Sequence, residues 1–323
     1  MVDLLHLILP LFPIILFIFL HKRRSPPPHK TLPPSPRKLP IIGNLHQLGT
    51  YPHRSLHSLS QRYGHLMLLH FGRVPVLVVS SADAACEIMK NQDLIFSNRP
   101  KLSIPNRLLY GARDVSFAPY GEYWRQVRSI CVLQLLSNKR VQSFRRVREE
   151  ETSIMINKIK QMGTLASFVN LSEVLVQTTN DVVGRVALGR KYNDGGKGKM
   201  FKELLGEFVK LLGSFSVGDY ISWLSWIDRV SGLDARVERA AKMFDNFLEG
   251  VIEERRKRKR DEIVCGGEDQ GFDFVDILLE FQRENEGTSP VEDDTIKALI
   301  LVIIFFTCVY FFGFVQNDMH EYG

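Results

Sequence analysis

An apolar run at the start of the chain constrains most strongly what this sequence can form. Leu4 to Leu20 is a seventeen-residue run broken by one histidine and two prolines. As a helix it would extend about 25 Å, close to the thickness of a bilayer's hydrocarbon core. Asp3 precedes the run and the basic residues 22–24 follow it, the reverse of a cleavable signal peptide. A buried core helix is the alternative. We predict a transmembrane signal-anchor over residues 1–21, with the body of the protein on the cytosolic side.

Residues 22–40 form a basic and proline-rich hinge. Seven of the fifteen residues from Pro26 to Pro40 are proline, which excludes a regular helix or a central strand. An extended spacer of this length would hold a folded body within roughly 45 Å of the membrane. We expect that body to begin near Pro40.

Composition indicates a globular body rather than a disordered or fibrous one. The 323 residues are 45% hydrophobic and 24% charged, typical of a soluble fold. The four cysteines, at 86, 131, 265 and 308, have no CxxC spacing, which argues against a zinc site or a disulfide framework. The net charge of +6 suits an anionic surface, either a membrane or a nucleic acid.

The body is predicted to be mainly α-helical with a small antiparallel β-sheet. Residues 66–71 and 74–79 are two apolar runs around Gly72 and Arg73, a pattern typical of a hairpin. From Tyr120 onward the apolar spacing is helical, most clearly between Leu233 and Ile252. The glycine-rich stretch 195–199 lacks the spacing of a phosphate loop and is expected to connect two helices.

Arg255 to Arg260 is an unbroken run of six basic residues. Such a run can bind nucleic acid. However, it follows an amphipathic helical pattern, where cations favour the C-terminal end, and acidic residues flank it on both sides. We therefore expect a solvated helix end and no nucleic-acid partner.

Trp124 and Arg128 are the first candidates for a binding site. They are four residues apart and would share one face of a helix that begins near Tyr120. One indole N–H and one guanidinium could together bind a carboxylate. A core tryptophan with an arginine extending to the surface is the commoner arrangement of such a pair.

Four motifs occur in the order found in plant microsomal cytochrome P-450 enzymes: the anchor, Leu32-Pro-Pro-Ser-Pro with Pro40-Ile-Ile-Gly-Asn, Phe96-Ser-Asn-Arg-Pro, and Trp124 to Arg128. The chain resembles this family from residue 1 to about Leu301. The resemblance implies that Trp124 and Arg128 bind a haem propionate and that residues 101–118 line part of a substrate pocket. It also implies a monooxygenase that oxidises a small lipophilic specialised metabolite. Such an enzyme uses O2 and electrons from an NADPH-dependent cytochrome reductase at the endoplasmic reticulum membrane.

The same comparison with the family predicts an inactive chain. After residue 301 the sequence departs from the family's Ala-Gly-x-Asp/Glu-Thr stretch, and these 323 residues contain no Phe-x-x-Gly-x-Arg-x-Cys haem-ligand loop. A cysteine thiolate on the iron is what favours O–O cleavage in this chemistry. We expect a C-terminally truncated product, and we assign no catalytic residue and no metal-binding residue in it. The alternative is a non-catalytic, membrane-bound binding or interaction fragment.

These expectations divide the chain into an anchor (1–21), a hinge (22–40), a partial cytochrome P-450 domain (41–301) and a divergent apolar tail (302–323). Residues 298–315 are almost continuously apolar, so a second membrane crossing is an open alternative for them. If the layers that normally cover this helix are missing, its apolar face should be exposed.

Overall fold

The structure is a computed structural model that describes residues 32–164, 168–191, 196–265, 273–285 and 291–305. Within these ranges, no helix combines the length and the hydropathy that a membrane crossing requires. The predicted anchor and the tail beyond residue 305 lie outside them. The chain divides into two compact units, residues 1–98 with 217–228 and residues 99–216 with 229–323. The predicted fold class, mainly helical with a small antiparallel sheet, is confirmed.

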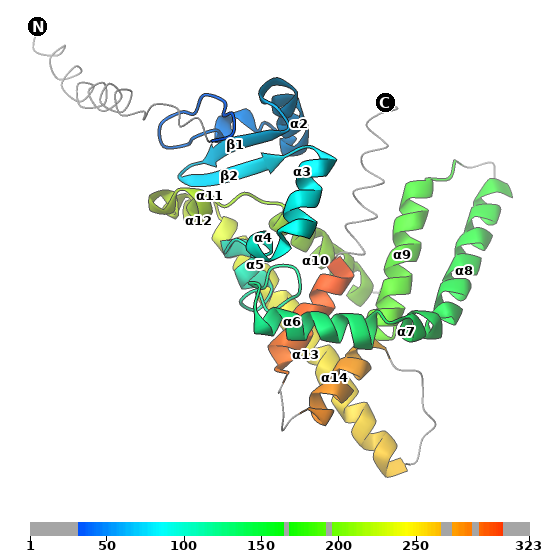
Figure 1. Ribbon diagram of the computed structural model, residues 1–323. Coiled ribbons are helices and arrows are strands. Elements are labelled where there is room, and N and C mark those ends of the chain that lie inside the picture. The colour runs from blue at the N-terminus through cyan, green and yellow to red at the C-terminus, as the bar shows by residue number, and fades with distance from the viewer. Residues whose placement is uncertain (1–31, 165–167, 192–195, 266–272, 286–290, 306–323) are drawn as a thin grey trace, which may run out of the picture. The chain divides into compact units, whose positions relative to one another are not determined.

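The first unit is built on the predicted hairpin, and Figure 1 shows it with α2 beside β1. Leu66 pairs with Val79 and Phe71 with Val74, which places the turn at Gly72 and Arg73. The elements of this unit are η1 (Leu45–Gln47), α2 (Pro52–Tyr63), β1 (Leu66–Phe71), β2 (Val74–Val79), α3 (Ala82–Cys86), η2 (Glu87–Asn91), α4 (Asp93–Phe96), α11 (Val217–Tyr220) and η4 (Ser222–Leu224).

The described part of the hinge packs against this hairpin. Leu68 donates its backbone N–H to the carbonyl of Pro34 at 2.9 Å. The buried Asn44 accepts a 2.8 Å hydrogen bond from the backbone of His70 and donates to the carbonyl of Pro36 at 3.4 Å. Among the described residues, Pro34 and Pro36 therefore already take part in the folded structure, several residues before the predicted start near Pro40.

The second unit is helical. Its elements are α5 (Ser103–Leu108), α6 (Glu122–Ile130), the π-helical η3 (Cys131–Leu135), α7 (Asn138–Ser143), α8 (Arg145–Thr164), α9 (Leu171–Leu188), α10 (Gly196–Leu212), α13 (Leu233–Cys265), α14 (Phe274–Glu284) and a last helix over residues 293–305. A short helix, α12 (Trp226–Val230), crosses from the first unit into the second. The glycine-rich stretch was expected to be a loop, but α10 already begins at Gly196.

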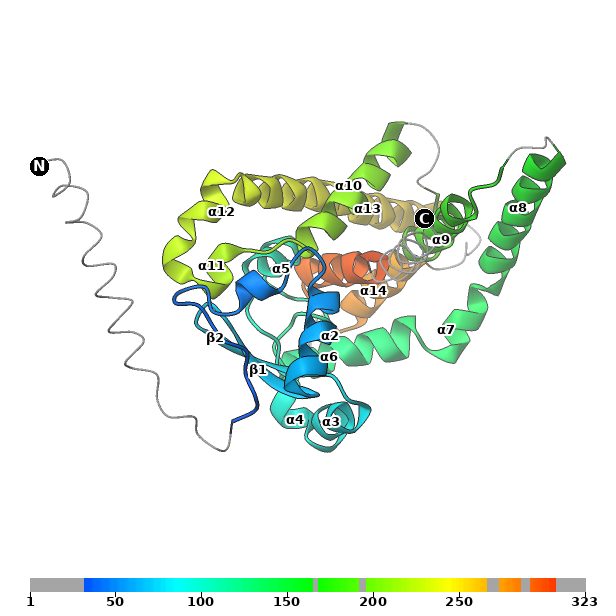
Figure 2. The same ribbon diagram turned by 90° about the horizontal axis from the view of Figure 1, so that it is seen from above.

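The core of the second unit forms around α13, which follows the periodicity predicted from the sequence. Its residues Val237, Phe244, Leu248 and Ile252 are almost completely buried. Phe208 of α10 packs edge-on against Phe244, with ring centres 5.0 Å apart, where α10 crosses α13 in Figure 2. Burial of each such side chain contributes about 1.5–3 kcal/mol.

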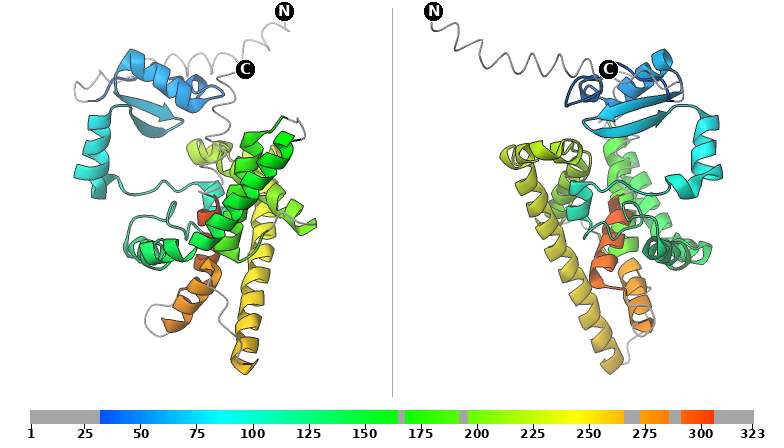
Figure 3. Two further views of the ribbon diagram at one scale, coloured as in Figure 1. Left: turned by 90° about the vertical axis from the view of Figure 1, so that its right-hand side faces the viewer. Right: turned by 60° about the vertical axis from the view of Figure 1, so that its left-hand side comes forward.

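The helix over residues 293–305 lies inside this core (orange-red in Figure 3). Its residues 298–302 are each at most 2% exposed. An uncovered apolar face was predicted here, and for these residues the prediction is wrong. Side chains of α9, α10, α13 and α14 belong to the same buried cluster. The core continues through Ile304, past the predicted domain boundary at residue 301.

Gly189 ends α9 in a left-handed conformation with a φ of +70°. A Cβ atom at this position would overlap the Arg255 guanidinium and the Asp273 carboxylate. Gly250, inside α13, has no such neighbour. The backbone at Gly189 therefore requires glycine for two independent reasons, its conformation and the close approach of two charged groups.

We predict that Gly189→Ala lowers the free energy of unfolding by at least about 1–2 kcal/mol, the cost of a left-handed non-glycine residue. The matched Gly250→Ala variant should raise it by about 0.5–1 kcal/mol, because alanine is the better helix former. Urea denaturation followed by circular dichroism measures both. Equal stability of Gly189→Ala and the parent chain would contradict the packing described here.

Candidate functional site

Trp124 and Arg128 lie one turn apart on α6, on one face, as their spacing predicted. The guanidinium carbon of Arg128 lies 5.0 Å from the centre of the Trp124 ring. Trp124 is half-buried and Arg128 is exposed. This geometry is a cation–π contact at the surface, which contributes about 0.5–1 kcal/mol. The two side chains are therefore together, but they are in contact with each other rather than spread around a shared ligand.

The indole N–H of Trp124 already has an acceptor within the chain. It donates a 2.8 Å hydrogen bond to the backbone carbonyl of Val115. In the same turn, the buried carboxylate of Asp114 accepts hydrogen bonds from the backbone N–H groups of Ser116 (2.6 Å) and Phe117 (3.1 Å). Trp124 and Asp114 together fix the turn over residues 114–118. Sequence spacing could not indicate this role, because a backbone acceptor leaves no side-chain pattern.

The two cysteines whose surroundings are described lie in different environments. Cys131, at the start of η3, is buried, and burial together with the nearby Asp114 carboxylate raises the pKa of its thiol to about 11. A neutral thiol is a poor ligand for iron. Cys86, at the end of α3, is exposed. Cys131 is therefore a poor fit for a haem–thiolate group, and the indole N–H of Trp124 is already engaged.

Residues 101–118, expected to line a substrate pocket, have two different environments. Ile104, Leu108 and Leu109 pack in the core and are almost fully buried. Residues 111–113 instead border a cavity of about 320 Å³. Within the predicted stretch, residues 111–113 therefore face a space that could hold a ligand.

A second polar cluster, which the sequence analysis missed, surrounds the buried amine of Lys297. The ammonium group lies 2.7 Å from Asp245 and 2.6 Å from Glu249 of α13. Tyr110 donates a 3.1 Å hydrogen bond to Asp245, and its ring centre is 5.6 Å from the Lys297 nitrogen. Burial alone would lower the pKa of Lys297, but the two carboxylates hold it above its usual range. The spacing of Asp245 and Glu249, four residues apart on one helix face, was a signal that could have suggested this cluster.

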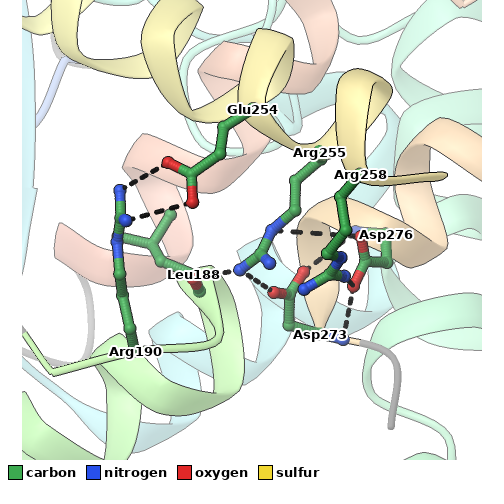
Figure 4. Close-up of polar contacts among 7 residues, drawn as sticks. All are labelled: Leu188, Arg190, Glu254, Arg255, Arg258, Asp273 and Asp276. Carbon is green, nitrogen blue, oxygen red and sulfur yellow. Dashed lines mark hydrogen bonds and ion pairs between the residues drawn. The ribbon is translucent and has the colours of Figure 1, made fainter. Parts of the chain in front are cut away.

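Arg255, Arg256, Arg258 and Lys259 of the basic run pair with acidic side chains of the protein, and Figure 4 shows part of this network. Arg255 pairs with Asp273 at 2.6 Å and also donates to the carbonyl of Leu188, and Arg258 pairs with Asp276 at 2.9 Å. Arg256 pairs with Asp293, and Lys259 pairs with Glu280. The run was expected to be compensated by the acidic residues that flank it, but the partner acids of these four residues come from residues 273–280 and from Asp293.

The part of the chain that the structure describes contains no group of three or more His, Cys, Asp or Glu side chains arranged to hold a metal ion. Electrostatic pairing therefore accounts for the acidic clusters found around Lys297 and Arg255.

Comparison with known proteins decides the family. A family model described as Cytochrome P450 matches residues 33–306. The chain belongs to the cytochrome P450 family. It is 61% identical over 293 residues to Cytochrome P450 71A6 of Nepeta racemosa, a match that covers 88% of this chain and 57% of that protein. The resemblance inferred from the sequence motifs is thus confirmed.

Two further relatives in the same family have names that state an activity. The chain is 54% identical over 292 residues to (+)-menthofuran synthase of Mentha piperita, covering 90% of this chain and 57% of that enzyme. It is 48% identical over 302 residues to tabersonine/lochnericine 19-hydroxylase of Catharanthus roseus, covering 94% of this chain and 59% of that enzyme. The chain therefore spans somewhat less than three fifths of the length of these cytochrome P450 relatives.

We predict that Trp124→Phe lowers the free energy of unfolding by about 1–2 kcal/mol, because the hydrogen bond to Val115 and part of the ring contact are lost. Trp226→Phe is the matched control: Trp226 is 57% exposed, so its replacement should change stability by less than about 0.5 kcal/mol. Urea titrations followed by far-ultraviolet circular dichroism compare them. If both variants match the parent chain, Trp124 does not fix the 114–118 turn.

Proposed function

We propose that this chain forms the N-terminal portion of a haem-dependent monooxygenase that oxidises a small lipophilic specialised metabolite. The 61% identity to a plant cytochrome P450 and the family match over residues 33–306 are the observations that support this most directly. Relatives named for menthofuran synthesis and for tabersonine hydroxylation support the substrate class. O2 and electrons from an NADPH-dependent reductase complete the proposed reaction.

We further propose that these 323 residues do not assemble a haem–thiolate centre by themselves. The neutral, buried thiol of Cys131, the exposed Cys86 and the engaged N–H of Trp124 support this. Haem supplies oxygen activation when a thiolate holds its iron. In this chain, α6 and the 114–118 turn contribute a preformed wall, and the exposed Arg128 lies against Trp124 on α6.

The same observations favour a second function, that of a non-catalytic binding or interaction fragment at the endoplasmic reticulum membrane. In this proposal the apolar run at 1–21 anchors the chain in a single pass and the body faces the cytosol. Asn170, Leu171 and Ser172 form a glycosylation acceptor, and the side chain of Asn170 caps α9. An unmodified Asn170 in microsomes is expected, and a glycan there would reverse the proposed orientation.

The proposed inactivity is tested by the reduced carbon-monoxide difference spectrum of the purified chain after incubation with haem. We expect no thiolate-type Soret band, whereas full-length Cytochrome P450 71A6, prepared in the same way, should give one. A Cys86→Ser, Cys131→Ser double variant is the matched control for adventitious binding to these two thiols. A thiolate-type band from the 323-residue chain that disappears in the double variant would contradict the proposal.

A further inference from the structure

The second unit contains a cavity of about 320 Å³ where the 110–112 turn, α6 and residues 291–295 meet. Val127, Ile130 and Val291 form its apolar walls. Its volume is near the lower end of the range for small-molecule sites. At a water molecule's share of about 30 Å³ in the liquid, it has room for about ten non-hydrogen atoms.

One wall of the cavity has an unusual backbone. Tyr110, Gly111 and Ala112 have φ values of +52°, +80° and +58°, three successive left-handed residues of which two are not glycine. Contacts of the Tyr110 side chain hold this strained turn in place. Its hydroxyl donates to Asp245, and its ring lies beside the Lys297 ammonium group. Strained backbone persists where the surroundings determine it, and such positions are concentrated at binding sites.

The polar side chains that line the cavity are Arg113, Tyr123, Gln126, Glu292 and Thr295. Among them, the hydroxyls of Tyr123 and Thr295 are in contact with each other. Tyr123 donates its hydrogen to the carbonyl of Arg113 at 2.9 Å, and its oxygen lies 3.0 Å from the Thr295 hydroxyl. Since the tyrosine hydrogen is used, Thr295 donates to Tyr123, which leaves acceptor lone pairs on both oxygens. Thr295 is almost fully buried. A ligand that reaches this pair must therefore donate a hydrogen bond.

Charge at the cavity is already neutralised. Arg113 and Glu292, both among the residues that line it, form an ion pair with each other. Tyr123 is 39% exposed, and the partial burial of its hydroxyl raises its pKa above the usual range, so the hydroxyl stays neutral. A charged ligand would have to break the Arg113–Glu292 pair or enter the apolar part without a partner, and both are costly.

We propose that this cavity binds a small neutral alcohol with an apolar ring skeleton, whose hydroxyl donates to the Tyr123–Thr295 pair. The apolar walls favour an apolar ring skeleton, and the two hydroxyl oxygens favour a ligand that donates a hydrogen bond. The Arg113–Glu292 ion pair leaves no free charge to bind an ionic ligand. The cavity is bordered by residues 111–113 of the stretch expected to line the substrate pocket, so this inference rests on the proposed function and specifies its ligand class. The binding itself needs neither haem nor thiolate.

The test compares two ligands that differ in one donor. The probes are 4-tert-butylcyclohexanol and 4-tert-butylcyclohexanone, titrated calorimetrically against the full 323-residue chain in lipid nanodiscs, with empty nanodiscs as the blank. We expect the alcohol to bind about five- to tenfold more tightly than the ketone, the effect of about one hydrogen bond. Equal affinities for alcohol and ketone, or no binding of either, would overturn the proposal.

Variants locate the site. Tyr123→Phe should lower the affinity for the alcohol to that for the ketone. Thr295→Val should have the same effect, and it provides the test if Tyr123→Phe does not fold. Val291→Phe, which fills the apolar wall, should abolish binding of both ligands. Tyr51→Phe removes an exposed phenol in the first unit and should leave both affinities unchanged. Retention of the alcohol preference in both Tyr123→Phe and Thr295→Val would overturn the assignment. Because no readout involves haem, failure here leaves the monooxygenase proposal separately testable.

Discussion

One buried guanidinium, that of Arg255, joins three helices of the second unit. It donates at 2.6 Å to the carbonyl of Leu188, the last residue of α9, and pairs at 2.6 Å with Asp273, the N-cap of α14. A charge in such a place is tolerated only when it is fully paired, and removal of one partner of a buried pair costs about 3–5 kcal/mol. The ends of α9 and α14 are therefore fixed with respect to α13. Burial, with the adjacent Asp276 carboxylate, raises the pKa of Asp273 to about 6.

This arrangement also fixes the helix over residues 293–305. Arg256, next to the buried guanidinium, pairs with Asp293 at 2.7 Å, and Gln282 of α14 donates to the same carboxylate at 2.8 Å. One turn later, Lys297 pairs with two carboxylates of α13. The start of the helix is thus held by charge and the rest by apolar burial. The 110–112 turn depends on this helix through Tyr110, and so does the wall of the alcohol site that we propose.

Local pattern predicted the elements, but not their long-range partners. The hairpin and the apolar face of α13 follow from spacing within a few residues, and both were predicted correctly. The stacking of Trp124 and Arg128 follows from helical geometry in the same way. By contrast, Arg255 and its Leu188 acceptor are 67 residues apart, and no local rule connects a guanidinium to a distant backbone carbonyl. The burial of residues 298–302 was missed for the same reason, because the other side chains of this cluster come from several helices that are distant in the sequence.

The side chains of the second unit pack around the helix over residues 293–305, and we expect this packing to form without haem. Amide hydrogen exchange of the purified, haem-free chain is the test. We expect slow exchange over residues 296–302 and over Phe244 to Ile252 of α13, where side chains are buried and the backbone is helical. Exchange of both segments at the rate of an unfolded chain, restored to protection only after haem is added, would contradict it.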